Sequence, residues 1–483
     1  MKKVNLIIIF SVLIGLSVTL TTHANNISVS TPTLTGQNNS QHYVFVQFDL
    51  SWDNSFRDEV NWDAVWVFVK YKVTDGNWSH ATLNTSGHSV TTTNGVAATI
   101  DTPSDGKGVF LYRTSQASGS INWDDVKLRW NYGTDGVADD ATVTVKVFAI
   151  EMVYVPTGTF AAGSGGSETS AFTLTTINTG NATTAPSGTG GFSGSAEGGY
   201  PAGQTAPDDS SWPNGYSDFY CTKYEISQGQ YADFLNTLTA SQDLTRFPGK
   251  DGSSRHTIGG STGSRSASVP DRACNCLSWM DGCAYMDWSG LRPMTELEFE
   301  KACRGAIAPV ANEYAWGNTN IAGSAYTLSN NGQYNEAIAT NYASEPTGNT
   351  SYSTTNGDIN GPLRCGIFAT NSSTRAEAGA SYYGVMEMSG NLWERTVTIE
   401  NVTGRGFTGT HGDGALSDDG NATNSDWPGY VDGEVTGATG SGFRGGDWYH
   451  AASYLRVSAR NLAVETSASR VIHTGFRGVR TAP

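Results

Sequence analysis

Three segments between residues 43 and 150 alternate apolar with polar residues, two more apolar segments lie between them, and this pattern constrains the fold more than any other feature of the chain. A period of two, in segments rich in β-branched and aromatic residues, is typical of strands that bury one face. Turn sequences such as TDGN and TTNG separate the segments. Residues 41–150 are therefore predicted to form an antiparallel β-sandwich domain. In the clearest segment, YVFVQFDLSW, the apolar positions are Val44, Val46, Phe48, Leu50 and Trp52.

The residues before this domain have the features of an export signal. Lys2 and Lys3 precede an apolar run that ends near residue 20, and Thr22-His23-Ala24 places small residues where a signal peptidase cuts. Residues 1–24 are therefore predicted to be a signal peptide, with an uncleaved membrane anchor as the alternative. Residues 25–40 are polar and rich in turn formers, which predicts a flexible leader.

No later segment reaches the roughly 20 apolar residues of a transmembrane helix. The mature protein is therefore expected to be secreted or attached to the cell surface, without a transmembrane segment. The formal charge is −16, from 29 Lys plus Arg against 45 Asp plus Glu, and nucleic acid is disfavoured as a partner because its phosphates require a basic footprint. In an exported protein, six cysteines suggest disulfides whose pairing the sequence does not reveal.

The chain changes character after residue 150. Residues 157–217 are dominated by Gly, Ser, Thr, Ala and Pro, which predicts long surface loops. Three helices are then predicted to begin at residues that can cap them, and after Gly305 no long helical period remains. The second half is therefore expected to be α+β with little regular secondary structure. The predicted caps are Ser227, Ser278 with Asp281 three residues on, and Thr295 with Glu298.

Seven motifs between residues 151 and 480 occur in a familiar order. They are MVYVPTGTF, YCTKYEISQGQYADFLN, LSWMDGCAYMDWSGLRPMTELEFEKACRG, YAWGN, YYGVMEMSGNLWERT, FRGGDWY and GFRGVR. Together they resemble the formylglycine-generating-enzyme (sulfatase-modifying factor) domain. The resemblance implies that residues 151–483 adopt an α+β relative of the C-type lectin fold that binds structural Ca²⁺. The predicted sandwich lies outside it.

The resemblance also implies particular ligands and a disulfide. The family's Ca²⁺ ligands fall on the side chains of Glu387 and Glu394 and on the carbonyls of Gly390 and Leu392, in the motif EMSGNLWE. Mixed carboxylate and carbonyl oxygens suit this hard cation. The alternative is that the two glutamates are only solvated. Cys303 lies on a helix that is structural in the family, and Cys365 is its candidate disulfide partner.

The family's oxidation of a sulfatase cysteine resembles a copper-thiolate mechanism. The cysteine pair that holds copper follows the Gly-Gly of the C-terminal motif, and thiolates suit copper(I) because it is soft. In this chain, residues 448–454 read WYHAASY, and the last cysteine is Cys365. Copper is therefore not expected. A base and nucleophile at His450 and Ser453 would lack any G-x-S-x-G context.

Residues that depart from the family's scaffold gather near the C-terminus. Aromatic and amphipathic side chains on a rigid scaffold suit ligand contact. The segment resembles the variable region of target proteins of diversity-generating retroelements, and ordinary loop drift is the alternative. The candidate ligand contacts are Tyr449, His450, Tyr454, Val471, Ile472 and His473.

The predicted function is that of an exported, non-catalytic binding or surface-structural protein. Its expected partner is an extracellular glycan or protein, or another copy of itself. Two alternatives stay open. One is a formylglycine-generating oxidase that acts on sulfatase cysteines. The other is an extracellular structural protein that assembles through exposed sheet edges.

Overall fold

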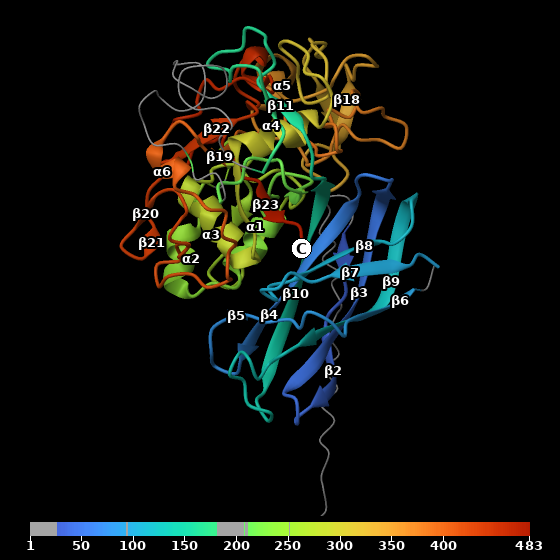
Figure 1. The fold of residues 1–483 in the computed structure, drawn as a ribbon, viewed down its shortest axis with the longest axis vertical. Helices are drawn as coiled ribbons and strands as arrows, with labels where there is room; N and C mark the ends of the chain where they lie inside the picture. The colour runs from blue at the N-terminus through green and yellow to red at the C-terminus, as the bar shows by residue number, and fades with distance from the viewer. Residues whose placement is uncertain (1–26, 93–94, 181–206, 208–210, 251) are drawn as a thin grey trace, which may run out of the picture.

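The computed structural model describes residues 27–92, 95–180, 207, 211–250 and 252–483. The predicted signal peptide and part of the predicted loop region over residues 157–217 lie outside these ranges. Figure 1 shows a part rich in long strands, in blue and teal, beside a part made of helices and loops. In the described ranges, no helix has the length and apolar character needed to cross a membrane.

The first sheet, as far as the described residues form it, has five strands, and all their pairings are antiparallel. Its order is β1-β3-β9-β6, and β2 also pairs with β3. The strands are β1 (Ser28–Val29), β2 (Thr33–Asn38), β3 (Tyr43–Arg57), β6 (Ser89–Thr92) and β9 (Ala117–Trp130).

The prediction of a flexible leader over residues 25–40 is wrong for its described part. Residues 28–38 supply β1 and β2, which pair with the middle of β3 and with its first residues, respectively. The long strand β3 offers backbone N–H and C=O groups with which these residues pair. Ile27 is buried among apolar residues of β3 and β9. Polar composition alone therefore did not distinguish an edge strand from a flexible segment.

The second sheet runs β22-β19-β16-β23-β13-β10-β4-β8-β7 through the described residues, with β5 paired to β4. Only the pairing of β16 with β19 is parallel among those described. The strands are β4 (Asp63–Val73), β5 (Ser79–His80), β7 (Ala98–Asp101), β8 (Val109–Arg113), β10 (Val143–Val155), β13 (Phe219–Thr222), β16 (Arg292–Thr295), β19 (Glu394–Val397), β22 (Ser441–Arg444) and β23 (Gly478–Thr481).

Strand β10 joins the two parts of the molecule. It pairs with β4 from residue 143 to 153 and with β13 from residue 152 to 155. One sheet therefore continues from the first 150 residues into the loop-rich part. The predicted domain boundary at residue 150 falls inside this strand.

Strand β4 is buried on both faces. Val65, Val67 and Val69 pack into a cluster that also draws on β3 and β9, so the two sheets pack face to face. Trp66 and Phe68 point to the other side, into a cluster shared with the helices. This double burial explains why the segment AVWVFV is continuously apolar instead of alternating.

The three predicted helix starts are confirmed, each with a capping box. Thr295, for example, accepts a hydrogen bond from the backbone N–H of Glu298, whose carboxylate accepts one from the N–H of Thr295. Gly305 follows the end of the third predicted helix, as expected. The helices are α1 (Gln228–Leu235), α2 (Ala240–Arg246), α3 (Trp279–Ser289), α4 (Glu296–Arg304), α5 (Ser353–Asn356), α6 (Val402–Arg405) and the 3₁₀ turns η1 (Gly357–Ile359) and η2 (Ala452–Leu455).

Long connections fill the rest of the loop-rich part, with four short hairpins among the described residues. The loops after residue 157 were expected to stay at the surface, yet Phe160, Phe172 and Trp212 are buried in the main cluster. Widely spaced aromatic residues therefore attach this segment to the main cluster, although the rest of its composition cannot form a core. The hairpins pair β11 (Phe160–Ala162) with β12 (Thr175–Ile177), β14 (Ile258–Gly259) with β15 (Ser266–Ala267), β17 (Thr327–Ser329) with β18 (Ala337–Thr340), and β20 (Tyr430–Val431) with β21 (Glu434–Val435).

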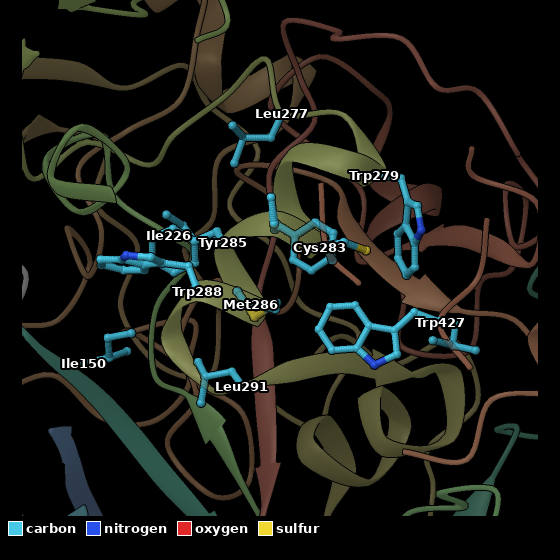
Figure 2. Packing of buried hydrophobic residues seen from close by; sticks show 14 of the residues in the cluster. Ile150, Ile226, Leu277, Trp279, Cys283, Tyr285, Met286, Trp288, Leu291 and Trp427 are labelled. Carbon is cyan, nitrogen blue, oxygen red and sulfur yellow. The ribbon is translucent and has the colours of Figure 1, made fainter. Parts of the chain in front are cut away.

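Helix α3 lies at the centre of the main cluster and is buried on nearly all sides. Figure 2 shows its Trp279, Tyr285 and Trp288 pointing in different directions among residues of other segments. Gly282 faces Phe476, which precedes β23. A Cβ added at Gly282 would lie 1.7 Å from Cδ2 of Phe476, so this close approach requires glycine.

We expect Gly282→Ala to destabilise the protein by about 1–3 kcal/mol, because overpacking outweighs the better helix propensity of alanine. The free energy of unfolding from urea titration measures this. Gly323→Ala is the control, since an added Cβ there meets nothing within 4 Å. A Gly282→Ala variant as stable as the parent would contradict the packing at Phe476.

The expected disulfide between Cys303 and Cys365 is absent, and all six cysteines are buried free thiols. Cys303 packs in a cluster with Phe299 and Met294, whereas Cys365 packs in another with Tyr224 and Trp448. Burial raises the pKa of every one of the six thiols. The cysteines therefore act as small apolar core residues.

A thiol count tests this arrangement. Without reductant, the native protein is expected to release almost no colour from a thiol-reactive disulfide reagent, because the thiols are buried and protonated. In denaturant, the same sample should show six thiols per chain. A count of four in denaturant would indicate a disulfide and overturn the assignment.

Candidate functional site

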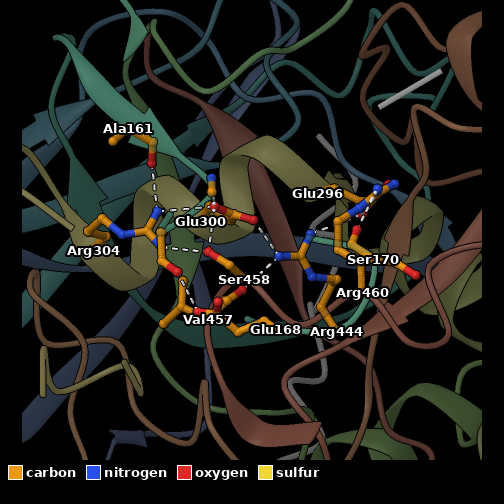
Figure 3. Close-up of polar contacts among 12 residues, drawn as sticks. Ala161, Glu168, Ser170, Glu296, Glu300, Arg304, Arg444, Val457, Ser458 and Arg460 are labelled. Atoms are coloured by element: carbon orange, nitrogen blue, oxygen red, sulfur yellow. Dashed lines mark hydrogen bonds and ion pairs between the residues drawn. The ribbon is translucent and has the colours of Figure 1, made fainter. Parts of the chain in front are cut away.

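A network of buried ion pairs ties the C-terminal segments to helix α4. Arg444 of β22 contacts Glu296 at 3.0 Å and Glu300 at 2.6 Å, and both carboxylates belong to α4. Arg460, farther along the chain, contacts Glu296 at 2.7 Å. Figure 3 shows these side chains converging from separate segments. All of them are inaccessible to solvent.

The charges in this network offset one another. Burial alone would raise the pKa of Glu296, but the guanidinium groups of Arg460 and Arg444 hold it below its usual value. Arg304 adds a contact to Glu300 at 3.0 Å and pairs with Glu313. Removing one partner would leave a buried charge without compensation.

We expect Arg444→Met to destabilise the protein by about 3–5 kcal/mol, since Glu296 and Glu300 would each lose a buried partner. Chemical unfolding monitored by near-UV circular dichroism measures the change. Lys127→Met is the control, because it removes a cation from a partly exposed side chain of β9. Equal stability of the two variants would show that the network does not hold the domain.

The candidate Ca²⁺ ligands lie in the loop that leads into β19. Glu394 begins this strand, and its Oε1 accepts a hydrogen bond from Arg477 Nε at 2.8 Å. Oε1 of Glu387 accepts one from the backbone N–H of Gly366 at 2.7 Å. Gly390 has a φ of 99°, and a Cβ there would lie 2.2 Å from Thr350 Oγ1, so the loop requires glycine.

The second carboxylate oxygens of Glu387 and Glu394 are unsatisfied. Both Oε2 atoms are buried and have no hydrogen-bond partner among the described residues. A third buried carboxylate, that of Glu225, accepts a hydrogen bond from the N–H of Leu392 at 2.8 Å. Burial and the nearby charges of Glu394 and Glu387 raise the pKa of Glu225. Burial raises the pKa of Glu387 to about 7, although Arg477 opposes this shift.

These residues fit a calcium ion. Three buried carboxylates lie near the guanidinium of Arg477, and Arg364 adds a second positive charge near Glu387, so carboxylates outnumber guanidinium groups at the site. The unpaired Oε2 atoms and the loop carbonyls are the oxygen donors that Ca²⁺ prefers. Sequence reasoning missed Glu225 and Arg477, which lie far from the motif in the chain.

Four of the six candidate ligand contacts come together. Tyr449 stacks on His473, with ring centroids 5.9 Å apart and planes 9° apart. His450 lies between them and Tyr454, at 5.2 Å from His473 and 5.1 Å from Tyr454. We call Tyr449, His450, Tyr454 and His473 the aromatic–histidine surface. Tyr449 is 61% exposed.

Val471 and Ile472 support this surface more than they extend it. The carbonyl of Ile472 accepts hydrogen bonds from the side chains of Asn275 and Trp448, and its side chain packs against the cluster that contains Trp448. The carbonyl of Val471 accepts the N–H of Cys276. Both side chains stay partly exposed.

Asp447 organises the aromatic–histidine surface from below, and sequence reasoning missed it. Its side chain is fully buried, and its Oδ1 accepts the backbone N–H groups of Tyr449 and His450 at 2.8 and 2.7 Å. Its Oδ2 lies 2.8 Å from His450 Nδ1. Aspartate side chains often accept hydrogen bonds from backbone N–H groups two and three residues later in the chain, so an aspartate at this position is the sequence signal of such a turn.

The surface contains no thiol, since all six cysteines are buried elsewhere. Among the described residues, Ser453 is exposed, and His450 Nδ1 contacts Asp447. Trp316, Trp393 and Trp448 are buried.

Comparison with known proteins identifies the loop-rich part. The family described as sulfatase-modifying factor enzyme 1-like domain matches residues 140–482. Among solved structures, the chain is similar to the Treponema denticola variable protein 1, at 13% sequence identity and a TM-score of 0.33. The match covers 69% of this chain and 96% of the Treponema protein. No curated protein sequence matches the chain.

Proposed function

We propose that this chain, which belongs to the family of sulfatase-modifying factor enzyme 1-like domains, is an exported, non-catalytic binding or surface protein. Its aromatic–histidine surface contacts an extracellular glycan or protein. The observation that carries this proposal is the composition of that surface. It has aromatic rings and imidazoles on a fixed backbone, and every thiol of the chain is buried away from it.

The thiol chemistry of the family argues against oxidation by this chain. Copper(I) is held by thiolates, and a thiolate must be formed where a substrate can reach it. Cys221 illustrates the obstacle, because it is fully buried and burial raises its pKa to about 12. A formylglycine-generating oxidase is therefore the less favoured alternative.

The geometry of the aromatic–histidine surface supports binding. Tyr449 places most of its ring in solvent, and its stacking on His473 restricts its rotation. Amphipathic rings with few free torsions give contact area at low entropic cost. Backbone N–H groups that bind Asp447 and the carbonyls of Val471 and His473 hold both contributing segments in place.

Binding of immobilised extracellular glycans and proteins by the purified chain tests this proposal. We expect Tyr449→Ala to weaken binding of any captured ligand at least tenfold, about 1.4 kcal/mol, as for an exposed aromatic anchor. Tyr334→Ala is the matched control, because Tyr334 is 67% exposed on another segment. Ligands that bind the parent and the Tyr449→Ala variant equally would contradict the assignment of the surface.

Calcium has a structural role in the proposal. The ion would be held by the side chains of Glu387 and Glu394 and by carbonyls of the same loop, Gly390 and Leu392. Its charge offsets the excess of carboxylates beside Arg477. The loop that leads into β19 would then be fixed relative to Gly366, whose N–H already contacts Glu387.

Chelation of Ca²⁺ is expected to lower the melting temperature by several degrees. An ion at 100 to 1,000 times its Kd stabilises a protein by about 3–4 kcal/mol. Because β10 is shared, we expect the whole chain to respond in one transition. Calorimetry with and without chelator measures this, with Glu59→Gln as an exposed carboxylate control and Glu387→Gln as the variant that loses the response. A melting temperature that chelator does not change would refute the site.

A further inference from the structure

We propose that Asp447, His450 and His473 form a binding site for a divalent transition-metal ion of the Zn²⁺ class. One ligand atom from each of these residues lies within 4.8 Å of those from the other two. Among the described residues, this is the one such group of three or more His, Cys, Asp and Glu side chains. The site is separate from the calcium loop and does not depend on the proposed function.

The distances are close to those of a coordinated ion. Oδ2 of Asp447 is 2.8 Å from His450 Nδ1 and 3.9 Å from His473 Nε2. Ligand atoms about 2.1 Å from a tetrahedral Zn²⁺ are about 3.4 Å from one another. One contact must therefore lengthen and the other shorten by roughly half an ångström for an ion to enter. The two imidazole rings are nearly perpendicular, at 88°, so they can converge on one point without clashing.

The charge of the site favours a cation. Asp447 is a fully buried carboxylate, and its ion-pair partners in the described structure are these two histidines. Each imidazole carries a positive charge only when it is protonated. A metal ion would supply a permanent positive charge while each imidazole binds through a neutral nitrogen.

The donor set selects the class of ion. Two imidazole nitrogens and one carboxylate oxygen suit Zn²⁺ and its first-row neighbours, whereas Ca²⁺ and Mg²⁺ prefer oxygen ligands alone. The missing thiolates make copper(I) a poor occupant.

The surroundings hold the ligands in place. Oδ1 of Asp447 accepts two backbone N–H groups and also lies 2.9 Å from His450 Nδ1, while Oδ2 lies near both imidazoles. The carbonyl of His473 accepts the N–H of Trp393 at 3.0 Å, and the ring of Tyr449 stacks on the His473 imidazole. Supporting contacts of this kind orient ligands and raise metal affinity.

Three protein ligands leave a coordination position open. The side chains of His450 and His473 are 26% and 22% exposed, whereas that of Asp447 is fully buried beneath them. The open position is therefore on the solvent side, beside Tyr449. A water molecule, or a carboxylate or hydroxyl group of a bound ligand, can complete the coordination there.

Titration with Zn²⁺ tests the site directly. The full chain, free of any histidine tag, is stripped of transition metals with chelator, returned to Ca²⁺ buffer and titrated with Zn²⁺ in a calorimeter. We expect one Zn²⁺ per chain. Co²⁺ in place of Zn²⁺ should give the visible absorption of a four- or five-coordinate ion with nitrogen and oxygen ligands.

Single substitutions locate the ion. His450→Gln and His473→Gln should each weaken Zn²⁺ binding at least 100-fold and remove the Co²⁺ absorption, with circular dichroism unchanged because both side chains are partly exposed. His42→Gln is the matched control, since His42 lies in the turn between β2 and β3 and contacts Asp139 at 2.8 Å without a third ligand. This variant should bind as the parent does.

Three results would overturn the proposal. They are a parent chain that binds no Zn²⁺, binding that survives in both His450→Gln and His473→Gln, and binding that His42→Gln removes. None of these bears on ligand capture through Tyr449, so the metal site and the proposed function can fail separately.

Discussion

Buried ion pairs between arginine and glutamate hold the loop-rich part of this protein together. Long connections make few hydrogen-bonded ladders, and the chain contains no disulfide to fix them. Arg444 and Arg460 instead bind α4 through Glu296, and Arg477 binds the start of β19 through Glu394. Each pair joins segments more than 80 residues apart. The positions of Asp447 and His473 depend on these attachments, because both residues lie on segments that the arginines anchor.

Strand β10 makes the two parts of the molecule one mechanical unit. Its backbone pairs with β4 on one side and with β13 on the other, so a single sheet runs through both. The main cluster also crosses the junction, where Trp66 and Phe68 of β4 meet residues of the helices.

Local patterns in the sequence predicted local structure well. The capping boxes at Ser227, Ser278 and Thr295 set the helix starts, because both of their hydrogen bonds lie within four residues. Alternation predicted the buried face of β3, because residues two apart in a strand share one face. The motifs after residue 150 also predicted the family that the comparison confirms.

Contacts between distant segments could not be predicted in this way. β1 and β2 form because β3 is long enough to pair with them, and nothing in residues 28–38 shows this. The disulfide expectation failed because an even number of cysteines says nothing of their distance in space, and Cys303 and Cys365 lie in different clusters. Asp447 and His473 are 26 residues apart in the chain, and only the fold brings them together.

We propose that this chain keeps the scaffold of its family and uses it for binding instead of thiol oxidation. The most direct measurement is mass spectrometry of a peptide with the cysteine motif of a sulfatase, incubated with the full chain, copper(I), a reductant and O₂. We predict that the peptide cysteine keeps its mass over hours. Copper-dependent conversion of that cysteine to an aldehyde, with several turnovers per chain, would show instead that the chain is an oxidase.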